Sequence, residues 1–564
     1  MRIIEVLLMT LAGVWQGLRQ DFNLLEIGLI IGVWWAWKRG WRPPAPRIRL
    51  FSQPWVMALF LAAGTVALRL ALIPVLPVPI PLVNDEFSYL LLADTLLHGR
   101  VANPTHPFWQ HFESIHILQQ PHYVSNYFPG HAVILAAARA AVGSPWAAIL
   151  LECFAFLAVL YWMLRGWMPA RWALFGVLLA ALRFGIGSYW INSYYGGFLA
   201  AIGGALIAGA FPRLRRQPSV ARGLVLGAGL AILAATRPFE GLLFSLPFLA
   251  VLAWEMRGRV SALLKTGLPA LALSGAMLVA LGVYFFHITG SPFVTPYEIS
   301  QKTYGWPMSL VWKTPPRIEQ RHIELARYYN FEMSEHEMVD GPVHLIEYLT
   351  FRLQECWRFF LGPVLTIPLI MLGHVWRRRR MLIIGLWGGL FAILFESAAS
   401  PHYLAPATAL IVAVVVECCR YFRRSWAPLV PLLPVTMALV LLLRIGAQSA
   451  GLPYTQKLNF QSWCCKVEGN LNKARIAETL HRLPGKHLVF VQPKKDDLDL
   501  NLYQWIYNDA DIDASDIVWA RDLGPERNAQ LENYFAGRQV WVVDPNDNPA
   551  TCHKYEHLAN TGVE

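Results

Sequence analysis

The chain has 564 residues, of which 55% are hydrophobic and only 15% are charged, and its formal net charge is +11. In a soluble globular protein about a quarter of the residues are charged. This composition therefore excludes an ordinary soluble domain and indicates a membrane protein. The basic residues lie in short clusters between apolar segments, as in the cytoplasmic loops of membrane proteins. This distribution argues against nucleic acid as a partner.

Apolar segments long enough to cross a bilayer recur as far as residue 446. A span needs roughly 20 apolar residues, and roughly eleven segments approach this length. They are 54–77, 145–165, 169–187, 196–212, 222–236, 239–255, 265–287, 351–374, 381–396, 402–419 and 426–446. Two weaker segments, 3–18 and 23–37, could form a preceding hairpin. The sequence therefore predicts an all-α polytopic membrane protein with about 11–13 transmembrane helices.

The basic clusters fall in alternate loops of this arrangement. They lie at 38–49, 165–171, 213–222, 257–265, 377–380 and 420–424. The positive-inside rule makes that side cytoplasmic. Two long loops, 78–144 and 288–350, and the tail from about residue 447 are then expected on the outer side.

The tail differs in composition from the rest of the chain. It is predicted to contain a helix at 474–483, strands at 487–492 and 517–520, a helix at 525–535 and a strand at 540–543. This order indicates a small α/β domain outside the membrane. We therefore expect a transmembrane domain over 1–446 and an extracytoplasmic domain over 447–564.

The most specific motif is NDEFSY at 84–89, after the 54–77 segment. Asn84 or Asp85 can cap a helix whose apolar side would lie along the outer membrane surface. Asp85 and Glu86 then lie at the boundary of water and lipid. They are either a cap and a first-turn acid that stabilise the helix, or a reactive carboxylate pair.

Further polar and aromatic residues gather on the predicted outer side. The histidines of loop 78–144, such as His111 and His116, match no standard metal-ligand spacing, so the sequence supports no cofactor, although a divalent metal stays open. Arg237 either clamps a phosphate or pairs with Glu240, three residues on. Arg183 lies deeper, where a charge is costly and suggests a function. The residues expected to bind substrate are Arg237, His402, Tyr403, Lys302, Arg183, Tyr194, Tyr195 and His111.

These features resemble the membrane glycosyltransferases of the C fold (GT-C). The nearest pattern is that of glycosyltransferase family 39 and its bacterial relatives, the protein O-mannosyltransferase and lipid A aminoarabinose transferase branch. The resemblance covers roughly residues 54–446 and rests on the acidic pair, the long first outward loop and the number of spans. The stretches that carry it are NDEFSYLLLADTLLHGR, NPTHPFWQHFESIHILQQPHY, NSYYGGFLAAIGGAL and TRPFEG. The chain has no WWDYG motif, which argues against an oligosaccharyltransferase, and no β-trefoil insert is evident.

The resemblance implies transfer of a sugar from a polyprenyl-phosphate donor to an acceptor hydroxyl. The reaction would take place at the periplasmic face of a bacterial inner membrane. Asp85 matches the general base of the family, whereas Glu86 matches the neighbouring acid only in kind. Arg237 is the first choice for the carrier phosphate. The sugar, the carrier length and the acceptor, which could be a glycan, a lipid or a protein, stay open.

Other functions are compatible with a polytopic membrane protein. The main alternative is a transporter or flippase of a lipid-linked or small polar substrate. Transporters place ionisable groups near the bilayer midplane and contain inverted repeats, and neither feature is clear in this sequence. A polysaccharide polymerase or ligase would share the donor class, whereas a simple anchor for the tail would not need so many spans.

Three cysteines lie in the predicted outer tail. An oxidising location permits a disulfide between Cys552 and either Cys464 or Cys465. Three free thiols are the alternative, because the geometry of the tail is not given by the sequence.

Overall fold

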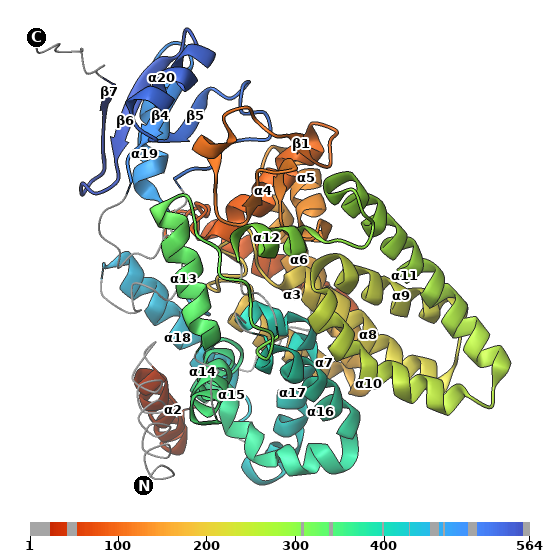
Figure 1. Ribbon diagram of the computed structural model, residues 1–564. Helices are drawn as coiled ribbons and strands as arrows, with labels where there is room; N and C mark the ends of the chain where they lie inside the picture. Colours follow the sequence, from red (N-terminus) through yellow and green to blue (C-terminus); the bar gives the residue numbers. More distant parts are fainter. Residues whose placement is uncertain are drawn as a thin grey trace, which may run out of the picture.

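The computed structural model describes residues 23–41, 53–305, 310–337, 342–396, 400–427, 429–451, 462–465, 469–493 and 505–555. Long helices form the bundle in the lower part of Figure 1, and the C-terminal sheet lies at the same end as the first loop. The helices and 3₁₀ turns of the bundle are α2 (Asn23–Lys38), α3 (Pro54–Ala71), α6 (Trp146–Trp167), α7 (Ala170–Phe184), α8 (Phe198–Arg216), α9 (Val220–Thr236), α10 (Pro238–Met256), α11 (Val260–Thr289), α14 (Pro342–Phe360), α15 (Gly362–Thr366), η3 (Ile367–Met371), α16 (Leu372–Leu394), η4 (Pro401–Ala407), α17 (Thr408–Trp426) and α18 (Leu432–Ser449).

Seven helical stretches of the described chain are long and apolar enough to cross a membrane, or up to eight with one bent pair. The protein is a multi-pass integral membrane protein, and the predicted fold class is confirmed. The boundaries differ from the sequence prediction in places. Segments 351–374 and 381–396 fall in the bent pair, whose halves meet at 97°, rather than in two separate helices. Segments 169–187 and 222–236 form helices of 15 and 17 residues, which is less than the roughly 20 residues that a span needs, and segment 3–18 lies outside the described residues.

Small residues bring the central helices close together. The helix α8 carries glycine and alanine on the faces that meet α6, α9 and η4. A Cβ at Gly204 would collide with the backbone of Pro406, and one at Gly203 would meet Leu233 at 3.0 Å. Close approach of this kind is typical of membrane helices, whose association is stabilised by van der Waals packing rather than by the expulsion of water. The η4 turn, with His402 and Tyr403, is thereby held against α8.

The loops over 78–144 and 288–350 are called the first and second outward loops after their predicted location, and the first folds into its own small layer. It contains α4 (Asn84–Leu97), β1 (Asn103–Pro104), η2 (Trp109–Phe112), β2 (Ile117–Leu118), β3 (His122–Ser125) and α5 (Gly130–Val142), and its strands pair in the order β1-β3-β2. The second outward loop contributes α12 (Pro296–Tyr304) and α13 (Ile323–Glu337).

The tail is an α/β unit, as expected from its sequence. It contains α19 (Leu471–His481), β4 (His487–Val491), β5 (Ile517–Arg521), α20 (Pro525–Tyr534), β6 (Gln539–Asp544) and β7 (Thr551–Lys554). The sheet order is β5-β4-β6-β7, with β4 parallel to both β5 and β6, and β7 antiparallel at the edge. The sequence missed β7, because this edge strand is polar and mostly exposed.

The helix α4 does not lie free on a lipid surface, as its amphipathic pattern predicted. Leu91 belongs to a hydrophobic cluster with Phe490 and Val518 of the tail, whereas Leu92 faces the main core of the bundle. The helix is therefore enclosed between the tail and the bundle. The predicted cap is also wrong: Val83 occupies the N-cap position, and neither Asn84 nor Asp85 caps the helix.

The cysteine prediction is corrected by the structure. Cys464 is bonded to its neighbour Cys465, and Cys552 on β7 is a free thiol. Neither of the predicted bridges to Cys552 is formed. The paired cysteines are buried against the segment that follows α7, where a Cβ at Gly187 would lie 2.8 Å from the Cys464 sulfur.

The orientation of the bundle can be tested by labelling. In a Cys552→Ser background, Lys302→Cys should react with an impermeant maleimide in intact cells, because Lys302 is exposed in the loop predicted to face outward. Arg378→Cys in the basic cluster of α16, also exposed, should react only after permeabilisation. The reverse pattern would overturn the topology.

Candidate functional site

Asp85 lies in the first turn of α4 with its carboxylate partly exposed to solvent, at 24% of the side chain. The hydroxyl of Tyr127 donates a hydrogen bond of 2.7 Å to Oδ1. Nε2 of His116 lies 3.4 Å from the same oxygen. Within the described part of the chain, no hydrogen bond occupies Oδ2 of Asp85. The carboxylate is thus held at one oxygen and accessible at the other.

His116 is fully buried beside this carboxylate. Burial lowers the pKa of His116 to about 4, against the opposing effect of Asp85. The imidazole is therefore neutral near pH 7, and its Nε2 also lies 2.8 Å from the hydroxyl of Tyr328 on α13. With His116 neutral, its contact with Asp85 is one between a carboxylate and an uncharged ring rather than an ion pair.

Glu86 has a different environment from its neighbour. Its side chain is buried, and Oε2 accepts hydrogen bonds from the backbone N–H groups of Leu82 and Val83 at 2.7 and 2.9 Å. Oε1 accepts a third bond from the backbone of Tyr194 at 2.9 Å. Burial raises the pKa of Glu86 to about 7, against the effect of these three donors. Both of its oxygens are occupied, and Glu86 ties the first loop to the segment after α7.

This role predicts a stability effect. Glu86→Gln replaces one accepting carboxylate oxygen by an NH₂ group, which would then face a backbone N–H donor. The change should lower the free energy of unfolding by about 1–3 kcal/mol. Thermal unfolding of the purified protein would measure it. Glu298→Gln is the matched control, since Glu298 is exposed and pairs only with Lys302 among described contacts. Equal melting of the two variants would contradict the structural role.

A second charged group lies where α9 ends and α10 begins. Arg237 is buried, and its guanidinium lies over the ring of Tyr403 at 4.1 Å. Its Nη1 is 3.5 Å from Oε1 of Glu240, so the predicted i, i+3 pair does form. The following Pro238 occupies the first position of α10 and leaves Arg237 outside both helices.

The charges of Asp85 and Arg237 act on the same buried tyrosines. Tyr89 follows Asp85 by one turn of α4, and burial raises the pKa of its phenol to about 12, with Arg237 opposing and Asp85 and Glu240 adding to the shift. The charges of Asp85 and Arg237 also both act on Tyr195. An anionic and a cationic group are thus within electrostatic reach of the same phenols.

Two of the buried polar atoms near Arg237 that have no hydrogen-bond partner in the described structure come from aromatic side chains. They are Nε2 of His402 and the hydroxyl of Tyr195, whose rings meet edge to face at 5.1 Å. The other ring nitrogen of His402, Nδ1, lies 3.2 Å from the hydroxyl of Tyr189. Buried polar atoms are normally satisfied, so these two are suited to meet polar groups of a ligand.

The other residues chosen from the sequence lie elsewhere or have structural partners. Lys302 is exposed, and its Nζ pairs with Glu298 at 2.8 Å. Arg183 donates to the carbonyls of Phe359 and Arg358 at the end of α14. Tyr194 donates its hydroxyl to the carbonyl of Pro79 at 3.0 Å. Nδ1 of His111 lies 2.9 Å from the carbonyl of Arg521, in contact with the tail.

Sequence reasoning missed Tyr328 altogether. It comes from a helix more than 200 residues after Asp85 in the chain, and no local pattern distinguishes it. The described residues also contain no group of three or more His, Cys, Asp or Glu side chains that could hold a metal ion.

Comparisons with known proteins were made by sequence and by structure. No family model matches the chain, and no curated protein matches it by sequence. By structure, it is similar to ArnT from Cupriavidus metallidurans bound to undecaprenyl phosphate, with 14% identity and a TM-score of 0.50 over 87% of this chain and 92% of that one. It is also similar to the oligosaccharyltransferase of Archaeoglobus fulgidus, with 12% identity and a TM-score of 0.42 over 77% of this chain, although the match spans only 62% of that longer protein. The chain therefore has the GT-C membrane fold.

Proposed function

We propose that this protein is a glycosyltransferase that moves a sugar from a polyprenyl-phosphate donor to an acceptor hydroxyl. The observation that carries the proposal is that a GT-C fold holds an accessible, oriented Asp85 carboxylate and the buried guanidinium of Arg237, whose charges act on the same phenol of Tyr195. The structurally similar ArnT binds undecaprenyl phosphate, which supports a lipid-phosphate donor. We place the reaction at the periplasmic face of a bacterial inner membrane.

Asp85 acts in this proposal as the general base. Tyr127 holds Oδ1, so that Oδ2 can accept the proton of the attacking hydroxyl. The hydroxyl oxygen forms a bond to the anomeric carbon, and the bond from that carbon to the carrier phosphate breaks. Phosphate is a good leaving group, so one base is sufficient, and a glycosidase-like pair of opposed carboxylates is not needed. Glu86 keeps the base in place through the backbone around it.

Arg237 acts as the partner of the carrier phosphate. Its planar guanidinium can bond two phosphate oxygens at once. Negative charge grows on the phosphate as the bond to the sugar breaks, and a fixed cation stabilises that charge. Tyr403 supports the guanidinium from one side, whereas Glu240 reduces its net charge before the donor arrives. His402 and Tyr195 offer hydrogen bonds to the sugar or the phosphate.

The decisive experiment is a transfer assay with purified protein in lipid nanodiscs. A panel of radiolabelled polyprenyl-phosphate sugars would be offered with candidate glycan, lipid and protein acceptors. We expect transfer from at least one donor. If no donor is consumed and proteoliposomes instead show movement of the lipid-linked sugar between leaflets, the protein is a flippase and the proposal is wrong.

A further inference from the structure

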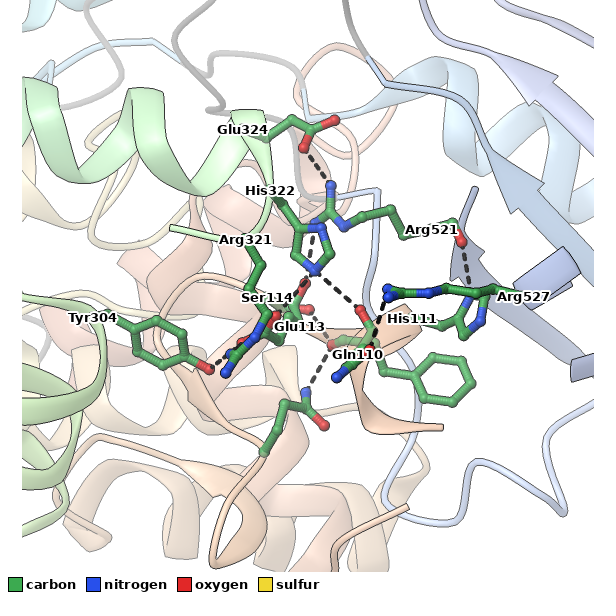
Figure 2. A network of polar contacts seen from close by, with 12 residues as sticks. Gln110, His111, Glu113, Ser114, Tyr304, Arg321, His322, Glu324, Arg521 and Arg527 are labelled. Atoms are coloured by element: carbon green, nitrogen blue, oxygen red, sulfur yellow. Dashed lines mark hydrogen bonds and ion pairs between the residues drawn. The ribbon is translucent and has the colours of Figure 1, made fainter. Parts of the chain in front are cut away.

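A buried carboxylate joins the two outward loops. Glu113 of the first loop is 1% exposed, and its Oε2 lies 2.9 Å from Nε2 of His322. Its Oε1 is 3.2 Å from Nη1 of Arg321 and accepts a bond of 3.3 Å from the hydroxyl of Tyr304. All three partners belong to the second outward loop (Figure 2). A buried charge needs such partners, so this cluster fixes the start of α13 on the first loop.

The C-terminal tail enters the same cluster through one side chain. Arg521, the last residue of β5, forms an ion pair with Glu324 in the first turn of α13. It also donates from Nη2 to the carbonyl of Glu113 at 3.1 Å. Its side chain is 8% exposed, and Figure 2 shows it extending from the tail toward α13. One residue of the tail thus contacts both outward loops.

The helix α13 reaches the candidate base one turn later. Tyr328 follows Glu324 by four residues, so the two side chains share a face of the helix. The hydroxyl of Tyr328 lies 2.8 Å from Nε2 of His116, and that nitrogen is 3.4 Å from Oδ1 of Asp85. A continuous series of contacts therefore connects Arg521 with Asp85 through a single helix.

We propose that the C-terminal domain acts as a brace that holds the Asp85 carboxylate in position through α13, with Arg521 and Tyr328 as positioning residues. The expected effects of this brace on kcat rest on the proposed transferase function. The tail thereby has a role in the reaction through α13, because the contacts of Asp85 itself come from Tyr127 and His116 of the first loop.

The kinetic test compares Arg521→Ala with Tyr328→Phe and the double variant. Each single change should lower kcat for sugar transfer about 3- to 30-fold, the range typical of mutations that act along a coupled network. The donor KM should stay unchanged, because Arg237 is untouched. The double variant should be no worse than Arg521→Ala alone, since both changes interrupt one series of contacts. Arg521→Lys should recover part of the rate.

The matched control is Arg482→Ala, which removes an exposed arginine of the same domain that pairs with Glu478. It should leave kcat unchanged. Glu324→Gln breaks the ion pair from the other side and serves if Arg521→Ala does not fold. Fully additive losses in the double variant would overturn the inference.

A second readout does not depend on activity. Hydrogen–deuterium exchange of peptides 113–127 and 323–337 should be faster in Arg521→Ala than in Arg482→Ala. If exchange in the two variants is the same, the brace is wrong whether or not the wild type transfers sugar. If exchange is faster but the wild type transfers no sugar, the brace stands and the proposed reaction fails.

Discussion

Asp85→Asn should lower sugar transfer by about 10²–10⁴-fold, the usual contribution of a general base. The amide keeps the shape of the side chain and can still accept the hydrogen bond from Tyr127. It cannot take a proton from the acceptor. The measurement is the single-turnover rate with a labelled polyprenyl-phosphate sugar, together with the elution profile and melting temperature of the variant.

The control for this prediction is a first-turn acid on another helix. Glu526 occupies that position in α20 and is exposed. Glu526→Gln should leave transfer unchanged, and any effect on helix stability should be small for both variants. Near-normal transfer by Asp85→Asn would reduce Asp85 to an acid that stabilises the start of α4, and another base would have to be sought.

Arg237→Ala should lower kcat/KM for the donor by about 10²–10³-fold, as expected when a fixed group that stabilises growing charge is lost. Arg237→Lys should recover only part of the activity, because an ammonium cannot bond two phosphate oxygens in one plane. Donor-concentration series with each variant would give these values.

The ion pair with Glu240 complicates this test and also provides its control. Arg237→Ala leaves Glu240 buried without its cation at 3.5 Å, which by itself can destabilise the protein. The double variant Arg237→Ala/Glu240→Gln removes the stranded charge. If transfer returns in the double variant, Arg237 only neutralises Glu240. If transfer stays low while the melting temperature recovers, the phosphate role is supported. Glu240→Gln alone should have little effect on donor use.

The residues that carry the site were only partly visible in the sequence. The acidic pair was chosen because the motif NDEFSY directly follows an apolar span, and Arg237 because it ends a span at the depth expected for the carrier phosphate. Lys302 had the right charge and the right loop, but it lies on the exposed side of α12 with Glu298. Charge and position along the chain do not specify the direction of a side chain.

Segments that can be identified locally were predictable from the sequence by itself. Membrane helices follow from runs of apolar residues, because each run is set by the thickness of the bilayer. The tail elements β4, β5 and α20 follow from residue patterns within a few positions. The polytopic fold and the α/β tail were accordingly predicted, apart from the bend between α14 and α16 and the polar edge strand β7.

Only the tertiary structure decided which acid is accessible and what surrounds it. Successive residues on a helix point about 100° apart, so Asp85 and Glu86 meet different partners although they are adjacent. Glu86 faces three backbone donors, whereas Asp85 faces Tyr127 and His116. The contact of Arg521 with Glu324 joins segments about 200 residues apart, and no local pattern records it. Such contacts depend on how separate elements pack, which is a property of the whole fold.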